Sequence, residues 1–210
     1  MLGPGESSAQ HLLGFPGMRQ VMSDRIELFS LRHFLTRIEC AGLIAHIDAN
    51  RRPSTIADHN GDAYFRTSET CDFDVTDRLV IALDAKLAWI SGIDPAFGEP
   101  CQGQRYDVGQ EFKPHTDFFA PDGADYEKYC AISGQRSWTF MIYLNDVTAG
   151  GGTRFPEINR TFQPERGTLL AWNNRLADGS GNPAALHHGM AVRKGAKYII
   201  TRWYRERIWG

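Results

Sequence analysis

What this 210-residue chain lacks excludes several classes of protein. Its longest apolar runs fall far short of the roughly 20 residues that a membrane-spanning helix needs. Its 23 Lys and Arg residues do not outnumber its 25 Asp and Glu residues, and the net charge of −2 provides no strongly basic surface. Such a surface would favour nucleic acid or an anionic membrane, so we expect neither as a partner.

Signatures of export and of zinc binding are also missing. Residues 1–18 contain no Lys or Arg and carry Glu6, whereas a secretory signal has a basic start and an apolar centre. The four cysteines are widely spaced and form no C-x-x-C pair, which argues against a zinc knuckle. We therefore expect reduced thiols in a cytoplasmic protein, with a flexible N-terminal arm rich in Gly, Pro and Ser over residues 1–23.

The first half of the chain predicts helices. Residues 28–31 are typical of a short strand, and Thr36 with Glu39 then forms a capping-box pattern. A second helix is expected to begin at a cap on Thr76 and to end at Gly92, with a polar loop at 51–62 between the two helices. The helical spacing is carried by two apolar series, Cys40, Leu43, Ile44 and Ile47, then Leu79, Val80, Leu83, Leu87 and Ile90.

After Pro100 the pattern changes to short apolar runs separated by Gly, Pro and Asn. We expect strands at 104–108, 138–144, 168–172 and 198–203, as in a β-sandwich or barrel. The sequence therefore predicts an α+β chain with a mainly β core. Residues 24–210 form a single domain in this prediction, with a helical part at about 24–99 and the β core at about 100–207.

Two side chains that commonly bind metals occur two positions apart, at His115 and Asp117. On an extended chain, residues two apart point to the same side, so both can reach one metal ion. The third ligand must come from elsewhere, and His187 or His188 is the obvious source. An H-x-D triplet alone often arises by chance. The full set, however, suits one face of an octahedral Fe(II) and leaves the opposite face open for a co-substrate and dioxygen.

Lys197 is the second unusual residue, because it begins an apolar strand. On that strand Lys197, Ile199, Thr201 and Trp203 are expected to share one face. A lysine on an inward face needs an anion to offset the burial of its charge. A dicarboxylate that also chelates the iron would provide that anion.

Longer sequence motifs around these residues resemble those of a known protein family. They are RYDVGQEFKPHTDFF, RSWTFMIYLNDVTAGGGTRFPE, GTLLAWNN and DGSGNPAALHHGMAVRKGAKYIITRWYRER, with FLTRIECAGLI and RTSETCDF in the N-terminal half. From about residue 28 to the end, the chain resembles the prolyl 4-hydroxylase-type 2-oxoglutarate/Fe(II)-dependent dioxygenases. The resemblance implies a double-stranded β-helix (jelly roll) with flanking N-terminal helices.

The resemblance also implies residue roles. The iron ligands would be His115, Asp117 and a distal histidine, which in the family lies ten residues before the lysine; 197 − 187 = 10 favours His187 over His188. Tyr106, nine residues before His115, and Lys197 would bind 2-oxoglutarate.

Substrate residues follow from the same resemblance. Arg136 and Trp203 correspond to positions that line the peptidyl-proline site, and Arg66 belongs to a loop that folds over the substrate. Simpler interpretations are a surface ion pair for Arg136 and core packing for Trp203. Phe112 departs from the family, because prolyl hydroxylases typically carry a tyrosine there, so the hydroxyl near the reacting carbon is missing.

The implied activity is hydroxylation of an unactivated C–H bond, with conversion of 2-oxoglutarate and O2 to succinate and CO2. It requires Fe(II), with ascorbate as a stimulant, and the implied substrate is a peptidyl proline or another protein residue. Two alternatives stay open: the same chemistry on a free amino acid or small molecule, and a non-catalytic metal-binding jelly-roll sensor or binding protein. The oligomeric state is not indicated. The presence of Asp117 argues against a halogenase, and the acidic balance argues against nucleic-acid demethylation.

Overall fold

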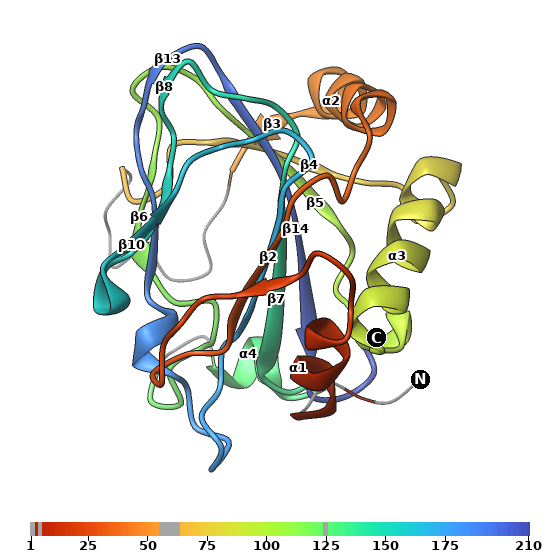
Figure 1. Ribbon diagram of the computed structural model, residues 1–210, viewed down its shortest axis with the longest axis vertical. Coiled ribbons are helices and arrows are strands. Elements are labelled where there is room, and N and C mark those ends of the chain that lie inside the picture. Colours follow the sequence, from red (N-terminus) through yellow and green to blue (C-terminus); the bar gives the residue numbers. More distant parts are fainter. Residues whose placement is uncertain (1–2, 4–5, 55–63, 124–125) are drawn as a thin grey trace.

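Most strands of the protein form two antiparallel sheets that face each other, with helices on the outer face of the larger one (Figure 1). The structure is a computed structural model that describes residues 3, 6–54, 64–123 and 126–210. The α-helices are α1 (Glu6–Leu13), α2 (Arg37–Asn50), α3 (Arg78–Ser91) and α4 (Tyr126–Cys130). Short 3-10 turns also occur in the described residues, at Pro95–Phe97, Pro156–Ile158 and Pro183–Ala185.

The larger sheet has eight strands. Their spatial order is β1 (Arg19–Gln20), β2 (Leu28–Leu31), β11 (Leu169–Asn173), β7 (Arg136–Tyr143), β14 (Lys197–Arg205), β5 (Gln102–Tyr106), β4 (Glu69–Asp72) and β3 (Arg52–Pro53). The central strands β7 and β14 are the longest and tie the two halves of the sheet together.

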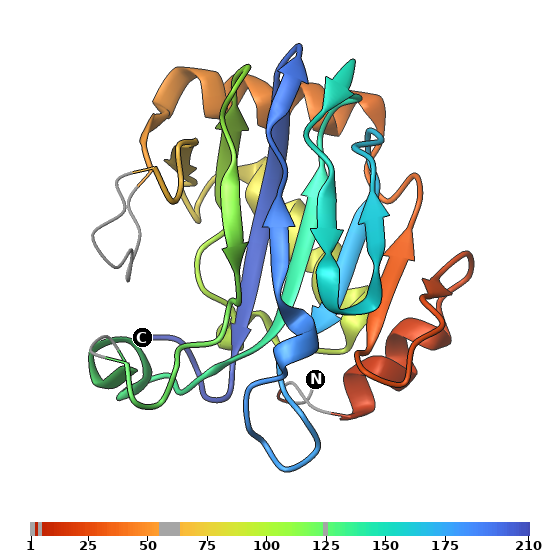
Figure 2. The same ribbon diagram turned by 90° about the vertical axis from the view of Figure 1, so that its left-hand side faces the viewer.

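The smaller sheet lies in front of the larger one in Figure 2, with α2 behind its upper end. Its order is β10 (Arg160–Phe162), β9 (Thr153–Phe155), β12 (His187–Gly189) and β6 (Phe112–His115). A separate pair is formed by β8 (Ala149–Gly150) and β13 (Val192–Lys194). This arrangement confirms the expected α+β architecture with a mainly β core.

Alternation along β7 divides the interior into two cores. Trp138, Phe140 and Ile142 face the helices, whereas Met141 and Tyr143 face the smaller sheet. Successive side chains of a strand point to opposite faces, so one strand serves both cores. The core between the two sheets continues into the space that holds the candidate site.

The four strands expected after Pro100 are all present, with ends shifted by no more than two residues, as β5, β7, β11 and β14. Residues 28–31 form β2 as predicted. Most of the loop expected at 51–62 lies outside the described residues, and its start contains the two-residue strand β3.

The helix caps were predicted with one error. The Thr36–Glu39 capping box opens α2, and Gly92 ends α3 in the left-handed conformation at φ 69°, both as expected. The cap of α3 is Asp77, not Thr76. The Asp77 carboxylate accepts from two backbone N–H groups of the first turn, whereas the backbone N–H and hydroxyl of Thr76 donate to Asp74.

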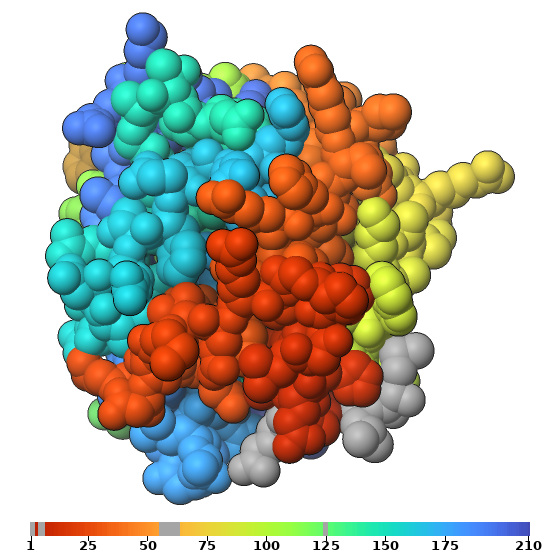
Figure 3. Space-filling view, viewed as in Figure 1, coloured from red at the N-terminus to blue at the C-terminus, as the bar shows by residue number. Residues whose placement is uncertain are grey.

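The N-terminal segment differs from the flexible arm that we expected. Residues 6–13 form α1, which buries Ala9 and Leu12 against the core beside α3. Residues 19–20 pair with β2 as the edge strand β1. Figure 3 shows this red segment lying flat on the body of the molecule. The short apolar pattern of α1 between Gly- and Pro-rich flanks gave too weak a signal to predict the helix.

All four cysteines are free and buried, in agreement with the reduced thiols that we expected. Within the described ranges, none of the helices has the length and apolar character needed to cross a bilayer.

Gly103 allows α2 to approach β5 closely. A Cβ atom at this position would lie 2.5 Å from Ile47 Cγ1 and 2.9 Å from Phe73 Cε2. We expect Gly103→Ala to lower the free energy of unfolding by about 1–3 kcal/mol, because overpacking forces the helix away from the sheet. Denaturant unfolding would measure this loss. Gly14→Ala is the control, since its nearest contact would be an ordinary 3.5 Å.

Candidate active site

The fold brings together the three residues expected to bind a metal. His115 ends β6 and His187 begins the neighbouring strand β12, and the two residues are directly paired in register. Asp117 follows β6, and its Oδ2 lies 3.9 Å from His187 Nε2. One ligand atom from each residue lies within 4.8 Å of the others, and the described part of the chain contains no second cluster of this kind.

Backbone carbonyls orient both histidine rings. Nδ1 of His115 lies 2.7 Å from the Lys113 carbonyl oxygen, and Nδ1 of His187 lies 3.0 Å from that of Ala185. A ring that donates through Nδ1 leaves the Nε2 lone pair free for a metal. Burial, reinforced by the proximity of His187, holds the pKa of His115 well below its usual value, so the ring is neutral as a ligand must be. The donor set therefore fits a divalent iron.

His188 points to the opposite side of the strand. Its Nε2 lies 2.8 Å from Glu111 Oε2, away from the other two candidate ligands. This placement agrees with the alternation of adjacent strand residues, and it leaves His187 as the distal histidine near His115 and Asp117.

A buried hydrogen-bond chain supports Asp117 from behind. Thr139 Oγ1 donates to Asp117 Oδ2 at 2.6 Å, and Asn174 Nδ2 donates to Thr139 Oγ1 at 2.8 Å. Thr139 and Asn174 are completely buried. Neither residue was predicted from the sequence, although a threonine within the apolar run Trp138–Leu144 is the signal that could have found the first of them.

Thr139→Val is expected to weaken metal binding by about ten- to 100-fold, the usual effect of losing a group that holds a ligand in place. Valine keeps the shape of the side chain but cannot donate to Asp117. Thr139→Ser keeps the hydroxyl and should bind metal almost as tightly as the parent. Competition with a chelating dye would measure the dissociation constants. Equal affinities for the valine and serine variants would contradict the role of the hydroxyl.

Lys197 lies beside the metal-ligand cluster, directly opposite Tyr106 in the β14–β5 pair. Its side chain is 1% exposed, and no carboxylate of a described residue influences its ionisation. Nζ instead lies 5.1 Å from the ring centre of Tyr106 and 5.6 Å from that of Tyr143. Burial lowers the pKa of Lys197 to about 7. A buried lysine with no anionic partner among the described residues fits the binding of an anionic ligand.

One small pocket connects this lysine with the candidate metal ligands. It is lined by Lys197, Tyr106, His115, Asp117 and His187, among others. The prediction that one face of β14 carries Lys197, Ile199, Thr201 and Trp203 is also confirmed, since all four residues line this pocket. A ligand that joins the metal to Lys197 would lie within this pocket.

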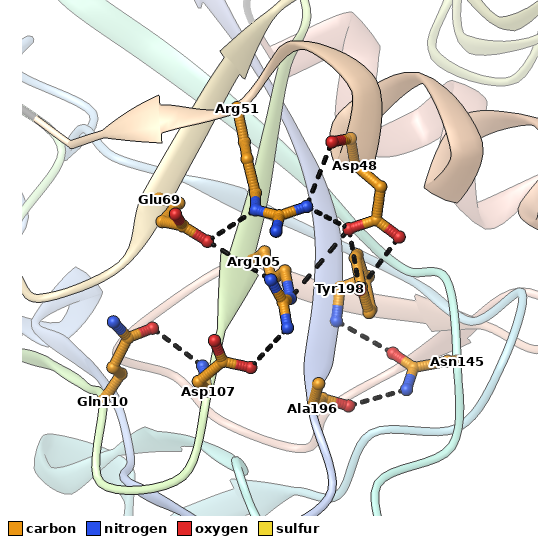
Figure 4. A network of polar contacts seen from close by, with 9 residues as sticks. All are labelled: Asp48, Arg51, Glu69, Arg105, Asp107, Gln110, Asn145, Ala196 and Tyr198. Atoms are coloured by element: carbon orange, nitrogen blue, oxygen red, sulfur yellow. Dashed lines mark hydrogen bonds and ion pairs between the residues drawn. The ribbon is translucent and has the colours of Figure 1, made fainter.

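The opposite face of the sheet is fixed by an ionic network (Figure 4). Arg105 Nη2 lies 2.7 Å from Asp107 Oδ1, its Nη1 lies 3.5 Å from Glu69, and its guanidinium packs over the Tyr198 ring. The Tyr198 hydroxyl donates to Asp48 of α2 at 3.0 Å. Arg105 and Tyr198 immediately neighbour the Tyr106–Lys197 pair in register, so the network fastens the strands that carry that pair.

A larger cavity of about 590 Å³ opens over His115 and Asp117. Arg136 lies in its wall and forms two hydrogen bonds with Glu99, at 2.6 and 2.8 Å. The guanidinium carbon of Arg136 lies 3.9 Å from the ring centre of Trp203. Burial opposes the charge, but attraction to Glu99 outweighs it and raises the pKa of Arg136. Arg136 is therefore part of the cavity wall and not a surface ion pair.

Arg66 and Phe112 form another part of the wall. Arg66 lies over the Phe112 ring at 5.0 Å, and Phe112 stacks on His115 with ring centres 3.5 Å apart. The three residues expected at a substrate site, Arg66, Arg136 and Trp203, thus all line the cavity that opens onto the candidate ligands.

Comparisons with known proteins agree with this geometry. The sequence model of the 2OG-Fe(II) oxygenase superfamily matches residues 101–205. The alpha-1 subunit of prolyl 4-hydroxylase from Rattus norvegicus is 33% identical over 131 residues, which are 62% of this chain and 24% of the subunit. The chain thus spans about a quarter of that relative. Probable prolyl 4-hydroxylase 9 of Arabidopsis thaliana is 29% identical, with 89% of this chain and 71% of that protein covered.

Solved structures establish the fold. The viral collagen prolyl hydroxylase of Paramecium Bursaria Chlorella virus-1, solved as a 2OG complex, superposes with a TM-score of 0.66 at 24% identity. The superposition covers 85% of this chain and 94% of that one. This likeness confirms the double-stranded β-helix that the sequence predicted.

Proposed function

The chain belongs to the 2OG-Fe(II) oxygenase superfamily as an enzyme of the prolyl 4-hydroxylase type, and from this premise we propose that it hydroxylates a proline residue of a peptide or protein. The observation that carries the proposal is the meeting of three elements: the cluster of His115, Asp117 and His187, the buried Lys197, and an open cavity above them. The cytoplasmic location expected from the sequence stays a prediction.

The enzyme uses Fe(II) and 2-oxoglutarate, as its superfamily does. In our proposal His115, Asp117 and His187 hold the iron, and Lys197 with Tyr106 binds the distal carboxylate of 2-oxoglutarate. Together with O2, the bound pair supplies the oxidant that converts a C–H bond to an alcohol, while 2-oxoglutarate becomes succinate and CO2.

The protein side chains bind and orient the substrate in this proposal. Trp203, Phe112 and Phe119 give the cavity apolar walls that fit a proline ring and exclude water. Arg136, held by Glu99 and by the Trp203 ring, has a fixed position from which to bind a peptide carbonyl.

Mass spectrometry of peptides with varied residues around proline would test the proposal. We expect the Fe(II) protein to add one oxygen atom to a prolyl peptide in a reaction that needs 2-oxoglutarate, and Asp117→Ala to add none. If the protein converts 2-oxoglutarate to succinate but leaves every prolyl peptide unchanged, proline is not the substrate.

Hydroxylation of a free amino acid or small molecule is a second candidate, and Phe112 is the observation that favours it. Its ring stacks on His115 beside the reacting position and offers no hydroxyl to a proline. Screening free amino acids for 2-oxoglutarate-dependent oxygen insertion would separate the two substrates. The non-catalytic sensor that the sequence left open is not supported, because the chain is an enzyme of this family.

A further inference from the structure

The inner face of the larger sheet carries polar side chains along β5 and β14. Successive inward residues of β5 are Gln102, Gln104 and Tyr106, and Thr201 lies opposite Gln102 on β14. Gln104 is 3% exposed and lines the pocket that contains Lys197. A glutamine amide is seldom buried without a reason, since each of its polar groups needs a partner.

The side chains on this face form a directed series of hydrogen bonds. The Tyr106 hydroxyl donates to Gln104 Oε1 at 2.7 Å. Gln104 Nε2 donates to Thr201 Oγ1 at 3.1 Å and lies 3.4 Å from Gln102 Oε1. That same oxygen of Gln102 accepts from Arg66 Nη2 at 3.0 Å. The series therefore runs from the co-substrate pocket to the substrate cavity.

Tyr106 cannot serve two acceptors with one hydrogen. Burial raises the pKa of Tyr106, so the hydroxyl keeps its proton and donates its one hydrogen to Gln104, while Ser68 and Arg66 also interact with the hydroxyl oxygen. A carboxylate bound at Lys197 would compete for the same hydrogen. A half-turn of the Gln104 amide, which exchanges the places of Oε1 and Nε2, removes the competition. Nε2 can then donate to the Tyr106 oxygen, and Thr201 can donate to Oε1.

Gln102 opposes that half-turn. After it, Gln104 Oε1 would face Gln102 Oε1, which Arg66 holds in place, and two acceptors would meet without a hydrogen between them. The contact of Gln104 Nε2 with Gln102 Oε1 is then lost and the two oxygens repel each other, which costs free energy comparable to a lost hydrogen bond. Turning the amide is therefore easier when the Arg66–Gln102 contact is released.

We propose that Gln104 is a positioning residue whose amide orientation decides whether Tyr106 donates to the co-substrate, and that Gln102 and Arg66 set this orientation. Binding of 2-oxoglutarate is thereby coupled to Arg66 in the wall of the substrate cavity. The inference rests on the proposed binding of 2-oxoglutarate by Tyr106 and Lys197.

Calorimetric titration of the Mn(II)-loaded protein with 2-oxoglutarate tests the coupling without turnover. Gln102→Leu removes the opposing acceptor, so we expect binding to become about five-fold tighter, the scale of one net hydrogen bond. General damage to the site would weaken binding instead. Gln102→Glu keeps an acceptor for Arg66 and should give no gain. In a Tyr106→Phe background, Gln102→Leu should also give no gain, because no hydroxyl is left to redirect.

Gln104→Glu provides a second, independent comparison. A carboxylate cannot donate to Tyr106, so the hydroxyl stays turned towards it. We expect 2-oxoglutarate binding to weaken about ten-fold or more, with a smaller loss when Tyr106 is replaced by Phe.

The outcomes distinguish a failure of the proposed 2-oxoglutarate site from a failure of the proposed coupling. If the parent does not bind 2-oxoglutarate, the proposed site itself is wrong. If the parent binds but Gln102→Leu gives no gain, or gives the same gain without the Tyr106 hydroxyl, the coupling is overturned. Equal losses for Gln104→Glu with and without that hydroxyl would overturn it as well.

Discussion

Replacing His187 by alanine is expected to reduce 2-oxoglutarate turnover more than about 100-fold, whereas replacing His188 by alanine should leave it nearly unchanged. Losing a group that only supports a ligand typically costs ten- to 100-fold, so losing the ligand should cost more. His188 faces Glu111 on the other side of β12, where its loss breaks one partly exposed contact worth about 1 kcal/mol or less.

Succinate formation and metal content together measure this difference. The Fe(II) protein should show a weak visible charge-transfer band when 2-oxoglutarate is added without oxygen, and His187→Ala should lose or shift it. His188→Ala should keep the band, and its melting temperature serves as the control for folding. A full band in His187→Ala, or loss of the band in His188→Ala, would mean that the distal ligand has been assigned to the wrong residue.

The metal-ligand cluster could be predicted from the sequence, because local backbone geometry determines which of its residues point to the same side. The spacing of His115 and Asp117 predicts a shared side on any extended chain. The same alternation states that only one of His187 and His188 can face the metal. The choice between them came from the family spacing to Lys197, and the structure places His187 next to His115 as that spacing implied.

The hydrogen bonds that support the cluster could not be predicted in this way. Thr139 reaches Asp117 only because β7 lies behind the loop that follows β6, and Asn174 joins them from the end of β11. Gln104 meets Thr201 across 97 positions of sequence through the β5–β14 pairing. Such contacts depend on sheet order, and residue spacing along the chain does not determine that order.

The two errors in the predicted secondary structure, the cap of α3 and the missed helix α1, have local causes. Thr76 and Asp77 are both good cap residues, and the helix begins after the one whose carboxylate reaches two N–H groups. The helix α1 is short, and tertiary packing beside α3 stabilises it more than its own propensity does.

Lys197 should take up a proton when 2-oxoglutarate binds. Burial lowers the pKa of Lys197 from 10.5 to about 7 in the free protein. A carboxylate at hydrogen-bonding distance favours the charged form and raises that pKa again. At about pH 8, between these two values, binding should therefore be accompanied by uptake of up to about one proton. Titrations in buffers of different ionisation enthalpy measure this number.

The direction of the pH dependence follows from the same shift. Because the charged lysine binds the dicarboxylate, affinity for 2-oxoglutarate should fall as the pH rises above about 7, approaching ten-fold per unit. The free protein should behave oppositely. Its folded state binds fewer protons than the unfolded state between pH 7 and 10.5, so the contribution of Lys197 to stability rises with pH across that window.

Lys197→Met is the matched variant, since it keeps the length of the side chain and removes the charge. We expect it to bind 2-oxoglutarate about 100-fold more weakly, because a buried carboxylate loses its counter-ion. Proton uptake should disappear, and so should the part of the stability gain between pH 7 and 10.5 that the lysine contributes. If proton uptake persists in Lys197→Met, another group titrates on binding and Lys197 is not the residue that binds the dicarboxylate.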